Sequence, residues 1–281
     1  MPGTLFVVAT PIGNLEDITV RALRVLRDVA VIAAEDTRRT AHLLARHAIA
    51  TPTTSLHEHN EAGKSGALIA RLQRGDDIAL VSDAGTPTVS DPGGLLIRAA
   101  IGAGLRVEPV PGPSAVLAAL AASGLPTDSF AFVGFPPTRS KDRKLWFERI
   151  KALRGTIVFF EAPHRIQATL HEILREIGDC QTVVARELTK IHEELVRGPM
   201  STVARTVGEG RGEFTVVINI GQATVLTPAL SSDLGFIGIE FGVITKIKGM
   251  TRRKAINVLA RRHGLTPNRV YEILEESKKS G

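Results

Sequence analysis

Short apolar runs alternate with longer segments of helical periodicity along the first 220 residues, and this alternation constrains the fold more than any other feature. Such segments build repeated βα units, in which each helix returns the chain to the start of a parallel strand. The sequence therefore predicts an α/β protein with a mostly parallel sheet. The expected strands cover 4–10, 30–34, 77–82, 106–110, 130–134, 156–161, 182–186, 194–197 and 214–220.

The segments between these strands predict helices, and several begin beside a residue that can cap a helix. Asp17, Asp36 and Asp91 precede three of them, and Pro92 stands at the first helical position after Asp91. The expected helices cover 18–28, 37–47, 64–74, 92–103, 114–123, 141–153, 165–177 and 201–208.

Two interruptions divide the chain into three predicted domains. The run Pro111–Pro113 breaks the pattern with two prolines around a glycine, as in a hinge. The stretch from Gly221 to Leu234 is rich in Thr, Ser and Pro, which is typical of a linker. We therefore expect two α/β domains, 1–112 and 113–222, and a small helical C-terminal domain, 235–281.

Positive charge is concentrated in the C-terminal region. Residues 245–281 hold ten Lys and Arg and three Glu, whereas the preceding 244 residues hold 25 and 26. This asymmetry indicates a polyanionic partner such as RNA. Helices expected at 251–263 and 267–277, joined at Gly264 and capped at Thr266, have helix-turn-helix proportions. The expected RNA contacts are Arg252, Arg253, Lys254, Arg261, Arg262 and Arg269.

The same two helices have a simpler explanation. Their apolar positions predict a small core of their own, and a purely structural appendage is the alternative to an RNA-binding domain. The apolar positions are Ile256, Leu259, Val270, Ile273 and Leu274.

Composition excludes several other classes of protein. The single cysteine, Cys180, excludes an internal disulfide, and no apolar stretch approaches the roughly 20 residues that span a membrane. The start of the chain lacks the features of a secretory signal, so we expect a cytoplasmic protein. His57 and His59 lack a third ligand nearby, and no metal is predicted.

Three loops of small residues follow predicted strands, at the edge where open α/β sheets bind ligands. They are Val8–Leu15, Val81–Gly94 and Pro111–Ala115. The second is neither a dinucleotide-binding glycine turn nor a P-loop, because no Gly-Lys-Ser/Thr follows. We expect the three loops to face one cleft that takes a nucleotide-like ligand. For Asp91 alone, a helix start is the simpler interpretation.

Together with Ala34–Arg38 and Ala185–Lys190, these loops resemble the ordered motifs of the tetrapyrrole methylase superfamily, from about Thr4 to Ile220. The resemblance implies two α/β domains with S-adenosylmethionine in the cleft between them, and a homodimer. The motifs look like those of the branch that methylates the ribose 2′-hydroxyl of a cytidine in the decoding region of 16S rRNA. That rRNA, within the 30S subunit, is then the expected partner.

The resemblance also implies which residues bind the cofactor. Gly85, Thr86 and Pro87 take the place of the superfamily's Gly-x-Pro loop. Two positions depart from the pattern, since Thr88 stands where glycine is frequent and Ala162 where serine is frequent. The implied cofactor residues are Pro11, Ser82, Gly85, Thr86, Pro87, Val89, Ser114, Ala115, Ala162 and Phe214.

Methyl transfer to a hydroxyl requires alignment of the acceptor oxygen and a base or proton path for a weakly acidic proton. Asp36, Glu187 and Lys190 are the expected catalytic residues. Asp36 has an alternative role as a helix N-cap, and Lys190 is either a base with a lowered pKa or a phosphate contact.

Several cations stand where a helix start disfavours them. Arg38 and Arg39 begin one predicted helix, and His164 and Arg165 begin another. RNA phosphate would offset these charges, and the nearby Asp36 and Glu161 are the alternative. The basic run 139–144 is a further phosphate candidate or an ordinary solvated loop. Its expected contacts are Lys141, Arg143 and Lys144.

Two rival functions remain open at this point. A porphyrinoid C-methyltransferase of the same superfamily is one, although the basic C-terminal region and the scarcity of aromatic residues weigh against it. A non-catalytic RNA-binding assembly factor that retains the fold is the other.

Overall fold

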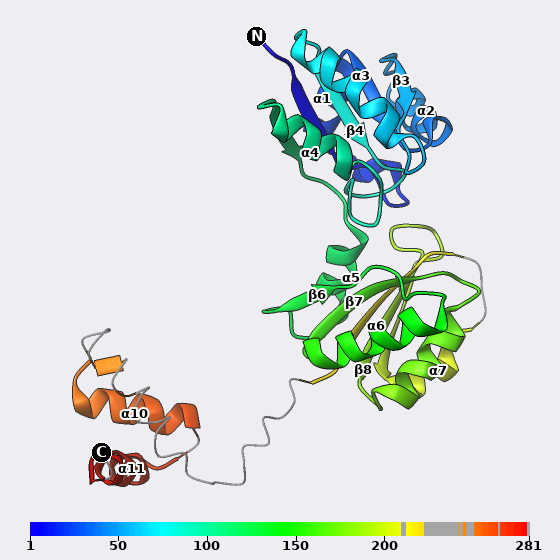
Figure 1. The fold of residues 1–281 in the computed structure, drawn as a ribbon. Coiled ribbons are helices and arrows are strands. Elements are labelled where there is room, and N and C mark those ends of the chain that lie inside the picture. Colours follow the sequence, from blue (N-terminus) through cyan, green and yellow to red (C-terminus); the bar gives the residue numbers. More distant parts are fainter. Residues whose placement is uncertain (209–211, 222–240, 242–243, 246–249, 264, 280–281) are drawn as a thin grey trace. The chain divides into compact units, whose positions relative to one another are not determined.

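The computed structural model describes residues 1–208, 212–221, 241, 244–245, 250–263 and 265–279, with the backbone alone at 261–263 and 276–279. The chain forms two compact units, residues 1–223 and 224–281. The first unit holds two five-stranded sheets, coloured blue to blue-green and green to yellow in Figure 1. The α/β fold is as predicted. The three-domain boundaries stay a prediction, and the expected linker lies outside the described residues apart from Gly221.

The first sheet is entirely parallel and has the strand order β3-β2-β4-β1-β5. Its two inner strands β2 and β4 are buried along their whole length, as expected for a parallel sheet covered on both faces. Strand β3 was not predicted, because three polar residues show no apolar run. The strands are β1 (Thr4–Val8), β2 (Val31–Ala34), β3 (Thr53–Ser55), β4 (Ile78–Val81) and β5 (Arg106–Val110).

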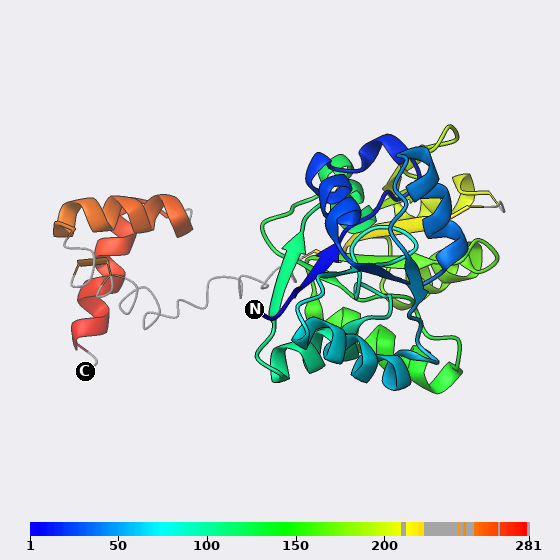
Figure 2. The same cartoon turned by 90° about the horizontal axis from the view of Figure 1, so that it is seen from above.

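Four helices cover the two faces of this sheet. Helices α1 (Val20–Asp28) and α2 (Thr37–Arg46) pack on one face, and α3 (Glu61–Gln73) and α4 (Gly94–Gly102) pack on the other. Figure 2 shows the blue pair and the cyan pair on opposite sides of the strands. The loops that follow the strands lie at their carboxyl ends, the edge at which open α/β sheets bind ligands.

The start of α1 differs from the prediction. Asp17 lies in a short 3-10 helix, Leu15–Asp17, and does not cap α1. Thr19 is the N-cap, and its hydroxyl accepts a hydrogen bond from the Ala22 amide at 3.1 Å.

The second sheet has the order β6-β7-β10-β8-β9, and only β6 and β7 are parallel. The expectation of a mostly parallel arrangement is therefore wrong for this sheet. The connection 187–193 between β8 and β9 is too short for a parallel crossover and makes a hairpin. The strands are β6 (Phe130–Phe132), β7 (Thr156–Glu161), β8 (Gln181–Arg186), β9 (Glu194–Pro199) and β10 (Phe214–Asn219).

Helix α5 (Ala115–Ser123) packs on one face of the second sheet, where Ala119 and Leu120 contact residues of β7 and β10. The opposite face carries the larger core, built around Trp146 and Phe159. The helices that supply it are α6 (Ser140–Leu153), α7 (Ile166–Glu176) and α8 (Met200–Thr206).

The second unit contains α10 (Arg252–His263) and α11 (Pro267–Lys279). The five apolar positions predicted to form a core are buried, so that prediction is confirmed. The Thr266 hydroxyl accepts a hydrogen bond from the Arg269 amide at 3.3 Å and caps α11, while Gly264 lies outside the described residues. Across the described part of the chain, no helix has the length and apolar character needed to cross a membrane.

Candidate active site

The three loops singled out in the sequence lie together at the carboxyl edge of the first sheet. Thr10 and Gly85 exchange backbone hydrogen bonds of 2.8 and 3.0 Å. The Thr86 hydroxyl donates to the Pro113 carbonyl at 3.4 Å. The first loop therefore joins the second, and the second joins the third.

A further motif from the second sheet docks on the first loop. The Asn14 amide donates to the Thr189 hydroxyl at 3.0 Å. A Cβ on Gly13 would lie 2.6 Å from Cγ of Lys190 and 2.8 Å from the Thr189 hydroxyl, so only glycine fits there. The segment Ala185–Lys190 thus forms part of the same assembly as the Val8–Leu15 loop.

A cavity of about 340 Å³ lies between these loops and the ends of β7 and β10. Its volume is in the range of small-molecule sites. Seven of the ten expected cofactor residues line it, namely Gly85, Thr86, Val89, Ser114, Ala115, Ala162 and Phe214.

Pro11, Ser82 and Pro87 are not among the lining residues. Ser82 is buried, and its hydroxyl lies 3.4 Å from the carbonyl oxygens of Ala84 and Gly85. Ser82 therefore stabilises the loop from its buried side, and a direct contact between Ser82 and a ligand is not indicated.

Of the three aromatic residues that line this cavity, the sequence singled out only Phe214. Phe135 and Phe160 line it, with ring centroids 5.5 Å apart, and Phe214 lines it from β10. Phe135 and Phe160 have no motif around them that could have placed them there. The rings of Phe135 and Phe160 offer an apolar surface suited to a flat heterocycle, whereas the Phe214 side chain is buried in the adjoining core.

The ionisable residues described in the cavity wall are all acidic. They are Asp91, Glu161 and Glu213, and none of the described lining residues is Lys, Arg or His. A low-dielectric cavity lined by carboxylates favours a ligand that carries positive charge.

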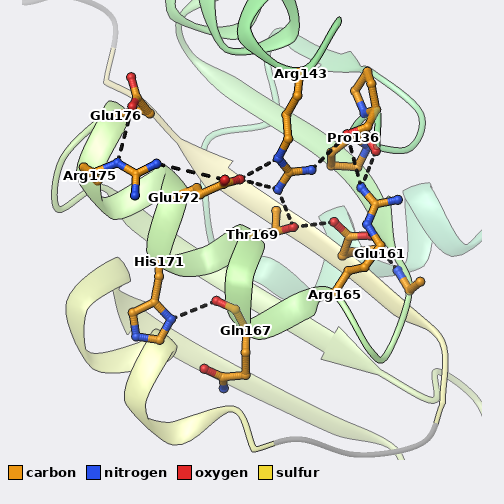
Figure 3. Close-up of polar contacts among 12 residues, drawn as sticks. Pro136, Arg143, Glu161, Arg165, Gln167, Thr169, His171, Glu172, Arg175 and Glu176 are labelled. Carbon is orange, nitrogen blue, oxygen red and sulfur yellow. Dashed lines mark hydrogen bonds and ion pairs between the residues drawn. The ribbon is translucent and has the colours of Figure 1, made fainter. Parts of the chain in front are cut away.

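Glu161 is the most buried of these carboxylates, and its side chain is inaccessible to solvent. It accepts hydrogen bonds from the Ala162 amide at 2.8 Å and the Thr169 hydroxyl at 2.5 Å, and Arg165 Nε lies 3.3 Å away (Figure 3). A buried charge needs such partners. Glu161 therefore fixes the turn that presents Ala162 to the cavity.

Two residues expected to bind RNA belong to the same network. Arg143 donates to Thr169 at 2.8 Å and pairs with Glu172 at 2.5 Å, and Arg165 donates to the Pro136 carbonyl (Figure 3). Their side chains are 14% and 21% exposed. Both guanidinium groups serve the fold, and phosphate contact by either is not indicated. Lys141 and Lys144 are exposed.

The cations at the start of α2 have local partners. Arg38 pairs with Asp36 at 2.7 Å, and Arg39 pairs with Asp83 at 3.4 Å. Nearby carboxylates thus offset both charges, as in the simpler of the two explanations given by the sequence. Both arginine side chains remain largely exposed.

Asp36 is the N-cap of α2 and accepts a hydrogen bond from the Arg38 amide at 2.8 Å. The hydrogen bond from the Arg38 side chain, together with that amide, holds the pKa of Asp36 well below its usual range. A carboxylate so stabilised in its charged form is a poor proton acceptor. The capping role is confirmed, and the predicted catalytic role finds no support.

Lys190 forms ion pairs with Glu187 at 2.9 Å and Glu213 at 3.3 Å. Burial alone would lower the pKa of Lys190, but the hydrogen bond that Lys190 donates to Glu187 and the charge of Glu213 outweigh it and raise that pKa. A base with a lowered pKa is therefore the wrong assignment for Lys190. The same bond to Lys190 lowers the pKa of Glu187, which is likewise unsuited to accept a proton.

The structure gives Asp91 a different place from the helix start that the sequence suggested. Helix α4 begins at Gly94 with Gly93 at its N-cap, so neither Asp91 nor Pro92 starts it. The carboxylate that accepts from the first amides of α4 belongs to Glu61, at 2.6 Å from Leu95 and 3.0 Å from Leu96. Asp91 instead lines the cavity.

Burial, and then the charge of Glu35, raise the pKa of Asp91 to about 6. A hydrogen bond with Ser82 opposes that rise, and Asp83 adds to it. Asp91 thus lines the cavity and has a pKa suited to accepting a proton near neutral pH.

The fold and the cavity define an α/β enzyme that binds a small ligand between two sheets. Residues 4–204 match the family model of Tetrapyrrole (Corrin/Porphyrin) Methylases, and the chain belongs to that family. It is a methyltransferase.

Among curated relatives, the chain is similar to Ribosomal RNA small subunit methyltransferase I of Pseudomonas aeruginosa, with 48% identity over 227 residues. These cover 79% of this chain and 80% of the relative. The protein of the same name from Synechocystis sp. is 42% identical over 282 residues, covering 99% of this chain and all of the relative.

Solved structures of lower identity share the fold. Uroporphyrin-III C-methyl transferase from Thermus thermophilus, complexed with S-adenyl homocysteine, has a TM-score of 0.55 at 21% identity and covers 77% of this chain and 97% of its own. Cobalt precorrin-4 methyltransferase has a TM-score of 0.56 at 20% identity, covering 77% and 94%. At these identities the likeness establishes the fold alone.

Proposed function

We propose that this chain uses S-adenosylmethionine to methylate the ribose 2′-hydroxyl of a cytidine in small-subunit ribosomal RNA. The observation that carries the proposal is the cavity: in a member of the methylase family, it gathers the cofactor motifs around acidic and aromatic residues. The names of the most similar relatives support the choice of RNA as the substrate.

The residues of the cavity fit the methyl donor. S-adenosylmethionine supplies a methyl group already activated on a positively charged sulfur. The acidic wall of the cavity suits the cationic groups of this ligand, and the rings of Phe135 and Phe160 offer apolar surface to the adenine. Ala115 and Ala162 have side chains small enough to let the ligand approach the backbone.

The C-terminal unit supports an RNA substrate on different grounds. Arg253 and Lys254 are exposed on α10, the backbone places Arg261 and Arg262 on the same helix, and the buried apolar residues hold α10 against α11. Arg252 is less available, because it pairs with Glu275 and its guanidinium lies 5.4 Å from the Tyr271 ring centroid. We assign rRNA phosphate contacts first to Arg253 and Lys254.

Three further statements belong to this proposal. The substrate is the 16S rRNA within the 30S subunit, the enzyme acts as a homodimer, and it works in the cytoplasm, where its substrate is assembled. The family resemblance of the sequence motifs supports each of them.

The test incubates the full chain with methyl-labelled S-adenosylmethionine and either 30S subunits lacking the modification or a tetrapyrrole precursor. We expect label in an rRNA ribose and none in the macrocycle. Label in the macrocycle would establish the porphyrinoid alternative, and label in neither, at saturating cofactor, would leave a binding or assembly role.

A further inference from the structure

Asp91 does not start helix α4, although its place in the sequence suggests that role. Glu61, from the start of α3, provides the carboxylate that satisfies the Leu95 and Leu96 amides of α4. Glu61 is itself only 5% exposed, so it is committed to that contact. A second carboxylate is not needed for the helix start, and Asp91 lines the cavity instead.

The loop that carries Asp91 is held in an unusual backbone conformation. Thr88 and Ser90 have φ angles of 72° and 69°, in the left-handed region that non-glycine residues rarely adopt. Such conformations persist where the surrounding structure enforces them, and they concentrate at functional sites. In this loop the two left-handed residues place Val89, Ser90 and Asp91 in the cavity wall.

From this placement we propose that Asp91 is the general base that accepts the proton of the ribose 2′-hydroxyl. The inference rests on the proposed function. It assigns the proton transfer to a residue outside the three candidates that the sequence suggested.

The step balances in atoms and electrons. The 2′-oxygen forms a bond to the methyl carbon while the bond between that carbon and sulfur breaks, and the electron pair of the broken bond stays on sulfur. The hydroxyl proton moves to a carboxylate oxygen of Asp91 and leaves later to solvent. One proton, one methyl group and no redox partner are involved.

The charged groups around Asp91 come from several elements. Glu35 follows β2, and its carboxylate accepts from the Asp83 amide at 3.3 Å, while Asp83 follows β4 and pairs with Arg39 of α2. From the second sheet, Glu161 and Glu213 line the same cavity. Glu161 pairs with Arg165, and Glu213 shares Lys190 with Glu187, whereas the positive charge that acts on Glu35 is that of Arg39.

This environment makes Asp91 a stronger base than an ordinary aspartate. Burial and the charge of Glu35 place the pKa of Asp91 at about 6, so the group is mostly ionised at neutral pH yet binds a proton more tightly than usual. The rate of methyl transfer should fall as the pH drops through about 6, because protonated Asp91 cannot accept a second proton.

A rival role for Asp91 is contact with a cationic group of the cofactor. The two roles predict different results, because loss of a base slows the reaction at saturating cofactor, whereas loss of a cofactor contact weakens binding. Asp91→Asn keeps the shape and removes the charge, and Asp28→Asn makes the same change at an exposed position at the end of α1.

The experiment measures S-adenosylmethionine binding by calorimetry and single-turnover methylation of 30S subunits from pH 5 to 8, with the full chain and both variants. For Asp91→Asn we expect a rate lowered roughly 10²- to 10⁴-fold, cofactor affinity changed by less than about threefold, and loss of the acid limb near pH 6. Asp28→Asn should behave as the unmodified chain.

Two results would overturn the assignment. One is an Asp91→Asn chain that methylates at an unchanged rate or keeps the acid limb. The other is a loss of cofactor affinity with a normal rate at saturation, which would make Asp91 a cofactor contact. If the unmodified chain binds the cofactor but labels no rRNA, the proposed function has failed, and the assignment of Asp91 fails with it.

Discussion

Two aspartates that follow strands of the first sheet stand before predicted helices but have different roles in the structure. After β2, Asp36 stands immediately before α2, accepts its backbone amide and caps it. In the loop after β4, Asp91 likewise stands immediately before a predicted helix, but α4 begins three residues later, and its first amides donate to Glu61. The first aspartate stabilises a helix and the second lines a cavity.

The difference shows how a residue becomes available for chemistry. An aspartate that caps a helix has its charge satisfied by amides, and Arg38 adds to this at Asp36. When a distant residue supplies the cap, the local aspartate is not stabilised by helix amides, and burial can then raise its pKa.

The largest effect on stability is expected at Glu61. Replacing it in Glu61→Ala leaves the amides of Leu95 and Leu96 without their carboxylate partner, Leu96 in a buried position. The free energy of unfolding should fall by about 2–3 kcal/mol, measured by urea denaturation at pH 7. Glu58→Ala, at an exposed position in the preceding loop, is the control. An equal, small effect in both variants would mean that Asp91 takes over the cap.

At Asp36 the expected loss is smaller. Asp36→Ala removes an N-cap and should lower the free energy of unfolding by about 1 kcal/mol, whereas Asp36→Asn should retain most of it because asparagine caps well. Methyl transfer by Asp36→Asn should stay within about threefold of the unmodified rate. A loss as large as that expected for Asp91→Asn would restore Asp36 as the catalytic base.

The pH dependence of stability should distinguish the two aspartates. The raised pKa of Asp91 means that the folded chain holds its proton up to about pH 6, while the unfolded chain has already released it near pH 4. Its contribution to stability is therefore present at low pH and is lost as the pH rises through about 6. The melting temperature of Asp91→Asn minus that of the unmodified chain should increase between pH 4 and 7. A difference that does not change with pH would contradict the raised pKa.

The smallest effect is expected at Thr88, in the loop that carries Asp91. Its φ of 72° suits glycine better than a β-branched residue. Thr88→Gly relieves this strain but adds freedom to the unfolded chain, so the net gain in the free energy of unfolding should be roughly 0.5 kcal/mol. Thr86→Gly, without a left-handed backbone to relieve, should instead lose stability.

Much of the first sheet could be predicted, because its strands are apolar runs and its ligand loops follow them directly. The grouping of the three loops followed from the rule that parallel strands end at one edge. The antiparallel second sheet could not be predicted from the same pattern, since apolar runs do not specify the direction of a neighbouring strand.

The functional residues were harder to place. Asp91 looked like a helix start because the partner that replaces it, Glu61, is 30 residues away in sequence, and local rules cannot include that contact. Arg143 looked like a phosphate ligand because Glu172, 29 residues away, meets it only in the folded chain, whereas Glu161 was already the alternative partner of Arg165 in the sequence. At Asp91 and Arg143, a tertiary contact determined which charges were left for function.

We propose that the cavity between the two sheets holds the methyl donor. Calorimetric titration of S-adenosylhomocysteine into the full chain tests it directly, with Ala115→Trp filling the cavity and Leu117→Trp adding the same bulk on the exposed side of α5. We predict one binding event that survives Leu117→Trp and disappears in Ala115→Trp. Binding of unchanged affinity in Ala115→Trp, or no binding by the unmodified chain, would contradict the claim.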